Sequence, residues 1–165
     1  MSRIQIAPPT LAGFLAFIRG NMAINTTVLP DNAPVIPLAF QIAMDLVNCD
    51  LNTASPDIYT LAVYNLGGDN IINFAPDVQP PVPYSDPANP DKLPFFAFLR
   101  WKWKLLDFNS GVVQSTGDEG TNVSLVVQEA AKNFTLANLQ NLKTPYGRQY
   151  LAFAQLAGPT IWGLS

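Results

Sequence analysis

The stretch PVIPLAFQIAMDLVNCDL, residues 34–51, decides how we expect the rest of the chain to fold. Its clearly polar positions are Gln41, Asp45 and Asn48, with Asp50 and Asn52 near the end. The steps of four, three and four through positions 41, 45, 48 and 52 place one narrow polar stripe on an α-helix. An ordinary surface helix has the opposite pattern, a limited apolar stripe on a polar rod. We therefore expect a central helix over 34–51 that is covered on most of its circumference, by its own domain or by a neighbouring subunit.

The whole chain is poor in charged residues. Of its 165 residues, 48% are hydrophobic and only 13% are charged, whereas soluble domains average about 25% charged residues. The length fits one domain, residues 1–165, with enough chain to bury a core. A compact domain of low solubility and a subunit largely covered by partners both fit this composition, and we favour the subunit.

Several functional classes are disfavoured. A net charge of −3 and the lack of a basic tail argue against a protein that binds nucleic acid by neutralising phosphates. The chain has no histidine, which removes most metal sites and the Ser/His and Cys/His nucleophilic systems. No pair of carboxylates lies in an apolar, helix-spaced setting that would separate two pKa values. We therefore expect no enzyme activity, no cofactor and no metal.

The lengths of the apolar runs and the single cysteine bear on location and redox state. The apolar runs are shorter than a membrane span needs, and prolines and a glycine interrupt the N-terminal apolar patch, so we expect neither a membrane segment nor a signal peptide. The single cysteine, Cys49, excludes an intramolecular disulfide, and its place in the expected central helix predicts a small buried residue.

Capping residues predict the other helices. For the central helix, Asp31 or Asn32 is the expected cap, and Pro34 and Pro37 fit only in the first turn. Gly67-Gly68 is the expected stop of a helix that begins at Ser55-Pro56-Asp57, with a turn or a second short helix at 71–74. The remaining expected helices are 11–19 capped by Thr10, 136–142 capped by Thr135, and 146–156 opened by Thr144-Pro145.

Residues 94–108, PFFAFLRWKWKLLDF, have an ambiguous pattern. The alternation over 100–104 favours a strand, but the 3–4 spacing of Phe96, Leu99, Trp103 and Leu106 favours a helix, which is our prediction, with Asp91 as a cap. Interleaved Trp and basic residues are typical of nucleic-acid stacking surfaces. Three basic residues without a wider basic surface are weak evidence for such a surface, and we expect instead that the aliphatic parts of these Arg and Lys side chains lie along a packed aromatic face.

Two segments are expected to project from the helices. Residues 75–94, the Pro-rich segment, hold seven of the fifteen prolines and favour polyproline II. At about 3.1 Å per residue the segment could reach roughly 60 Å, either folded back as a loop or crossing a neighbour as an arm. Residues 111–127 predict a β-hairpin, with a turn at 117–120 rather than a metal site at Asp118 and Glu119.

The order of these elements resembles the head–tail adaptor (connector or neck) proteins of tailed bacteriophages. The resemblance rests on TLAGFLAFIRGNM (10–22), APVIPLAFQIAMDLVNCDLN (33–52) and SPDIYTLAVYNLGG (55–68). The stretches FFAFLRWKWKLLDF (95–108), GDEGTNVSLVV (117–127) and LKTPYGRQYLAFAQ (142–155) are similar to phage structural proteins placed near portal and capsid genes. The Pro-rich segment and the hairpin are larger than a minimal adaptor requires.

The resemblance implies a structural virion protein. From the elements themselves we expect a mainly α fold with about five helices in a small bundle, the Pro-rich segment as an extended arm and the hairpin as an insertion. It implies a homo-oligomeric ring, typically a dodecamer, at the head–tail interface of the virion and in the host cytoplasm during assembly. Portal protein lies on one side, tail or nozzle protein on the other, and double-stranded DNA passes through the lumen without sequence-specific binding. The expected assembly contacts are Gln41, Asp45, Asn48, Pro80, Pro81, Pro83, Arg100, Trp101, Trp103, Asp118, Glu119 and Trp162.

Two other functions stay open. A tail terminator, tail-tube or capsid-associated virion protein would be mostly β-sheet. A small helical domain that binds an apolar ligand would line a pocket with Phe, Trp and Tyr side chains and would stay monomeric.

Overall fold

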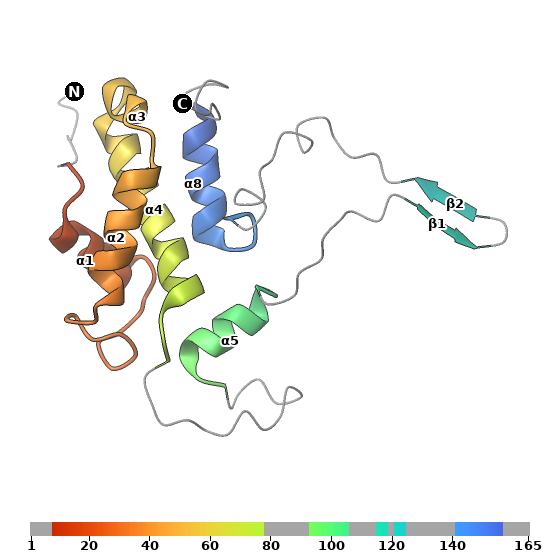
Figure 1. Cartoon of the computed structure of the whole chain (residues 1–165), viewed down its shortest axis with the longest axis horizontal. Coiled ribbons are helices and arrows are strands. Elements are labelled where there is room, and N and C mark those ends of the chain that lie inside the picture. Colours follow the sequence, from red (N-terminus) through yellow and green to blue (C-terminus); the bar gives the residue numbers. More distant parts are fainter. Residues whose placement is uncertain (1–7, 78–92, 106–114, 119–120, 125–140, 157–165) are drawn as a thin grey trace.

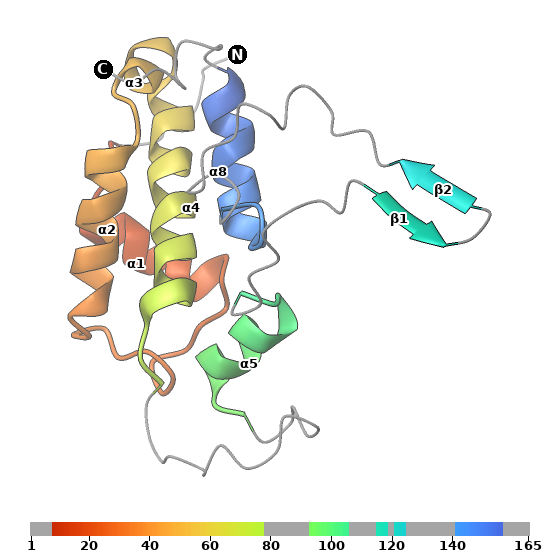
Figure 2. The same cartoon turned by 45° about the vertical axis from the view of Figure 1, so that its right-hand side comes forward.

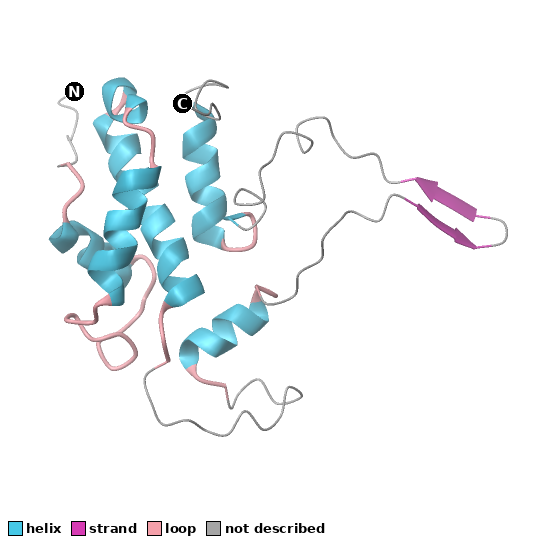
Figure 3. Cartoon of the chain, viewed as in Figure 1, coloured by secondary structure: helices cyan, strands magenta, loops and turns pink. Residues whose placement is uncertain are grey.

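The chain is mainly helical in its computed structural model, which describes residues 8–77, 93–105, 115–118, 121–124 and 141–156 (Figures 1 and 3). All but the last two residues of the helix expected at 136–142 lie outside the described residues. The elements are α1 (Leu11–Gly20), α2 (Val35–Leu46), α3 (Asp50–Ala54), α4 (Pro56–Phe74), α5 (Phe95–Lys102), β1 (Ser115–Asp118), β2 (Thr121–Ser124) and α8 (Pro145–Leu156).

The helix around which the others pack is α4, so the prediction of a central helix at 34–51 is wrong. From Tyr59 to Ile72 every residue of α4 is buried except Leu61, which is half-buried. Figure 2 shows α4 between α2 and α8, with α1 crossing behind and α5 near its C-terminal end. In contrast, α2 ends at Leu46 and is covered on one side only, because α1 and α4 both lie on that side.

Gly67-Gly68 does not end a helix. A Cβ atom on Gly67 would lie 2.8 Å from the ring of Phe14, and one on Gly68 would lie 3.1 Å from the sulfur of Met22. These glycines therefore let neighbouring side chains approach the backbone of α4, and the helix continues to Phe74. The expected break at 67–68 is wrong because close packing, rather than a turn, requires the glycines.

Three of the predicted caps are confirmed. Thr10 Oγ1 accepts a hydrogen bond from the backbone N–H of Gly13 at 3.0 Å, and Ser55 Oγ accepts one from Ile58 at 3.5 Å. Thr144 Oγ1 accepts one from the backbone N–H of the third residue of α8 at 2.8 Å. These bonds satisfy amides that the first helical turn leaves without partners.

The predicted cap of α2 is wrong. Pro34 occupies the N-cap position without a side-chain hydrogen bond, and Pro37 lies in the first turn as expected. Asp31 instead pairs with Arg19, whose guanidinium also donates to the carbonyls of Ile24 at 2.7 Å and Leu29 at 2.6 Å. The loop between α1 and α2 is therefore held by Arg19, and the Asp31 carboxylate pairs with Arg19 instead of capping α2.

Aromatic side chains fill the core where α1, α2 and α4 meet. The ring of Phe14 lies 5.6 Å from that of Phe40 and 5.9 Å from that of Tyr64, and Phe17 lies 5.8 Å from Tyr64, between ring centroids. Phe14 is fully buried, and removing such a ring typically costs about 3–5 kcal/mol of stability.

Strands β1 and β2 pair antiparallel, with Ser115 opposite Ser124 and Asp118 opposite Thr121. The rest of the expected hairpin at 111–127 lies outside the described residues. Cys49, predicted to be buried, is exposed because it lies in the link between α2 and α3. No helix in the described part of the chain is both long and apolar enough to cross a membrane.

Candidate assembly surfaces

The outer face of α2, opposite α4, carries apolar and polar side chains in two parallel rows. Leu38 and Leu46 are 59% and 63% exposed, and half-buried Ile42 lies between them at a spacing of four residues. Beside this row, Gln41 Nε2 donates a hydrogen bond to Asp45 Oδ1 at 3.0 Å. A ridge of side chains four residues apart is the surface that a second helix packs against.

The expected polar stripe is therefore shorter than the sequence pattern indicated. Gln41 and Asp45 lie together on α2, but Asn48 lies beyond its end, where Asn48 Oδ1 accepts a hydrogen bond from the backbone N–H of Asp50 at 2.9 Å. Asn48 thus contributes to the start of α3 and not to the outer face of α2.

The outer face of α8 is a second exposed helix face, and the sequence reasoning missed it. Its exposed side chains include Pro145, Arg148, Gln149 and Ala152, and Leu156 is 70% exposed. The opposite face packs toward the core: Tyr146, Tyr150 and Phe153 lie against it, and Ala154 is buried. The outer face could have been found by placing the remaining residues of the same helix on its other side.

Arg100, an expected assembly contact, is engaged inside the chain. Its Nε donates to the carbonyl of Ile72 at 2.9 Å, and Nη2 donates to the carbonyl of Ala75. Burial lowers the pKa of the Arg100 guanidinium, while Asp77, 3.9 Å away, acts to raise it. Arg100 thus satisfies carbonyls at the end of α4, a role that the sequence did not indicate.

Asp77 supplies the matching contact at the start of α5. Its Oδ1 accepts from the backbone N–H of Phe96 at 2.7 Å, and its Oδ2 accepts from Ala97 at 3.1 Å. Asp91, the expected cap, lies outside the described residues, as do Pro80, Pro81 and Pro83. The end of α4 and the start of α5, which flank residues 78–92, therefore lie next to each other.

The two tryptophans of this region differ in exposure. Trp101 is 46% exposed and stacks on Phe98 with 6.2 Å between ring centroids. Trp103 is half-buried and packs against the core. Asp118 ends β1; its side chain, Glu119 and Trp162 lie outside the described part of the structure.

A buried polar cluster joins α4 to α8. Asp69 is only 2% exposed; its Oδ1 accepts a hydrogen bond from Thr144 Oγ1, and its Oδ2 accepts one from Asn73 Nδ2 at 3.1 Å. Burial raises the pKa of the Asp69 carboxyl to about 6, against the lowering effect of both hydrogen bonds. Within the described part of the chain, the neighbouring Asn70 Nδ2 is buried without a hydrogen-bond partner. This enclosed cluster is a packing contact, and the expected pattern of helix faces did not reveal it.

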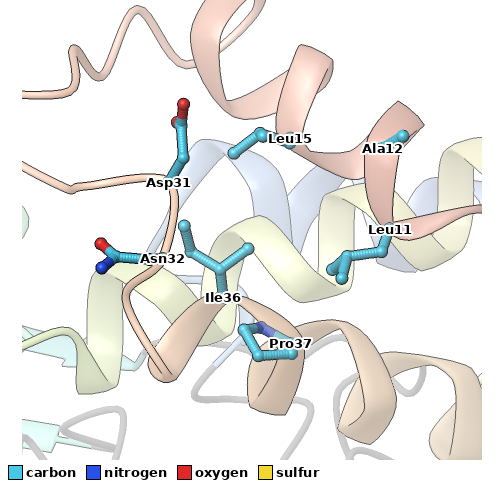
Figure 4. A pocket seen from close by; sticks show the side chains of 7 residues that line it. All are labelled: Leu11, Ala12, Leu15, Asp31, Asn32, Ile36 and Pro37. Carbon is cyan, nitrogen blue, oxygen red and sulfur yellow. The ribbon is translucent and has the colours of Figure 1, made fainter.

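A shallow groove of about 460 Å³ lies between α1 and α2 (Figure 4). One wall is formed by α1 and the other by α2, with two polar residues of the preceding loop at one end. Its lining residues are Leu11, Ala12, Leu15, Asp31, Asn32, Ile36 and Pro37. None of them is aromatic, so this groove is not the Phe-, Trp- and Tyr-lined pocket expected of an apolar-ligand-binding domain.

Comparisons with known proteins leave the family open. No family model, no curated protein and no solved structure matches the chain. The resemblance to head–tail adaptors therefore rests on the packing patterns in the sequence, and the surfaces described above are the basis for a functional proposal.

Proposed function

We propose that this chain is a non-enzymatic structural virion protein, a ring-forming head–tail adaptor that joins portal to tail around the DNA channel. The observation that carries the proposal is the pair of exposed helix faces, on α2 and α8, that lie on opposite sides of the buried helix α4 (Figure 2). A subunit with two separate contact faces is suited to a repeated head-to-tail contact, which closes into a ring when the rotation permits.

Composition supports the same proposal. Leu38, Leu46 and Leu156 are more than half exposed in a chain with only 13% charged residues, and contact with neighbouring subunits would remove them from water. The net charge of −3 suits a conduit that lets DNA slide without holding it. In this proposal the Pro-rich segment and the hairpin are insertions that reach portal, tail or neighbouring subunits.

The helical fold favours an adaptor over a tail terminator or tail-tube subunit, which would be mostly β-sheet. The test is to purify the chain and measure its mass, alone and with the portal and tail proteins of the same virus, by analytical ultracentrifugation and negative-stain imaging. We expect a ring, alone or on the portal. A well-folded monomer that binds neither component at any concentration would refute the proposal.

A further inference from the structure

We propose that the repeated contact of the assembly joins the outer face of α2 in one copy to the outer face of α8 in the next copy. This contact deepens the proposed function and rests on it. Helix α4 lies between α2 and α8, so the two faces point away from each other and cannot meet within one chain (Figures 1 and 2). Each copy therefore offers one face to each of two neighbours.

The two helices have the same length and direction. Both have twelve residues, and both run antiparallel to α4, as their colour gradients show in Figures 1 and 2. When copies are related by rotation about an axis along these helices, α2 of one copy lies parallel to α8 of the next. Two rods of equal length then pack side by side.

The two faces also lie at the same height along α4. A Cβ atom on Gly67 would lie 3.6 Å from the backbone oxygen of Ala39, and Thr144 Oγ1 donates a hydrogen bond to Asp69 Oδ1. Since both helices run opposite to α4 and each residue advances about 1.5 Å, corresponding heights can be counted along each helix from these two contacts. The counted pairs are Leu38 with Pro145, Gln41 with Arg148, Ile42 with Gln149 and Asp45 with Ala152.

All eight of these residues belong to the outward faces already described. Seven are exposed and Ile42 is half-buried. A contact made without any shift along the helix axis would therefore bury Leu38 against Pro145 and place Leu46 near Ala152. A ring requires such a contact, because any rise between copies would generate a helical filament.

Electrostatic complementarity favours contact between the outer faces of α2 and α8 over contact between two copies of the same face. Asp45 is the only charged residue on the outer face of α2, and Arg148 is the only one on the outer face of α8. Among the described residues, no ion pair or side-chain hydrogen bond involves the guanidinium of Arg148. Arg148 lies about one helical turn from the height of Asp45, within reach of an arginine side chain. Two α2 faces would oppose carboxylates, and two α8 faces would oppose guanidinium groups.

The first test reverses the charges. We expect Asp45→Arg and Arg148→Asp each to raise the concentration needed for assembly at least tenfold, measured by sedimentation velocity on the chain alone or, if portal is needed, on the portal-bound assembly. An equimolar mixture of the two variants should restore assembly, because every contact in an alternating ring again joins opposite charges. Lys102→Asp, an exposed change on α5, is the control and should leave assembly unchanged.

The second test traps the contact covalently. In a Cys49→Ser background, Ile42→Cys combined with Gln149→Cys should give a ladder of disulfide-linked oligomers on mild oxidation. Ile42→Cys alone should give nothing beyond a dimer, because a single thiol cannot extend a chain.

The possible outcomes separate the contact from the function. Assembly that ignores charge reversal, or that the mixture does not restore, or that yields no ladder, would overturn this contact and leave the adaptor proposal standing. A chain that never assembles, alone or with portal, would overturn both. Unchanged circular dichroism spectra of the single variants would show that lost assembly is not lost folding.

Discussion

Replacing Asp69 by asparagine should change how stability depends on pH. Asp69 is 2% exposed, and burial raises the pKa of its carboxyl from the ordinary 3.8 to about 6. The folded state therefore binds the proton more tightly than the unfolded state does. The stabilisation from this residue is fully present below about pH 4 and is lost as pH rises through about 6, by about 3 kcal/mol in all.

The part of this stability change that can be measured lies above the isoelectric point of the protein. Linkage with the two pKa values gives a fall of about 1.4 kcal/mol in the free energy of unfolding between about pH 5 and pH 8. Asparagine cannot ionise, yet its Oδ1 can still accept the hydrogen bond from Thr144. We therefore expect the free energy of unfolding of the wild-type protein, relative to that of Asp69→Asn, to fall by about 1.4 kcal/mol between about pH 5 and pH 8.

The assay is urea unfolding followed by far-UV circular dichroism at several pH values, at concentrations too low for assembly. Asp50→Asn, which removes a carboxylate from an exposed position, is the matched control and should shift the unfolding free energy by less than about 0.5 kcal/mol at each pH. If the difference between wild type and Asp69→Asn is the same at every pH, the buried carboxyl does not bind its proton as argued.

Three further predictions concern packing and capping, each checked by urea unfolding. Ala43→Asp should prevent folding, since Ala43 is fully buried and an unpaired buried charge costs several kcal/mol. Asp45→Asn, at an exposed site, should lower the free energy of unfolding by less than about 0.5 kcal/mol. Equal tolerance of both substitutions would contradict the placement of α2. Gly67→Ala should destabilise by about 1–3 kcal/mol through overpacking, whereas Gly20→Ala, with open space around the new methyl group, should be neutral or stabilising; a stabilising Gly67→Ala would contradict the close contact. Asp77→Ala should cost about 1–3 kcal/mol by leaving two amides of α5 without acceptors, and an unchanged midpoint would argue against that cap.

Local signals predicted most helix boundaries. Thr10 and Ser55 were read as caps because a hydroxyl before an apolar run satisfies the first amides of a helix, and the helices that follow begin as predicted. Thr144-Pro145 gave the start of α8 in the same way. These features depend only on residues within one turn of each other, so the sequence alone contains the information.

Contacts between distant residues were not predicted. Asp77 caps a helix whose first amides lie 19 and 20 residues further along, and Arg100 reaches back over 25 and 28 residues to carbonyls of α4. The outer face of α8 was also missed, although the residues on that side of the helix follow from its 3.6-residue period. Of the expected assembly contacts that lie in the described residues, Gln41 and Asp45 are the pair that the structure brings together on one exposed face.

The choice of the wrong central helix has a physical cause that bears on function. Two polar side chains of α4 are satisfied within the helix itself: Asn65 Nδ2 donates to the carbonyl of Leu61 at 2.8 Å, and Asn73 Nδ2 donates to that of Asp69 at 2.9 Å. Such bonds let a helix with polar residues be buried. The more apolar helix, α2, consequently lies at the edge with Leu38 and Leu46 exposed. Because α4 occupies the centre of the helices that the structure describes, the exposed apolar side chains of α2 are the surface on which the proposed contact with a second copy depends.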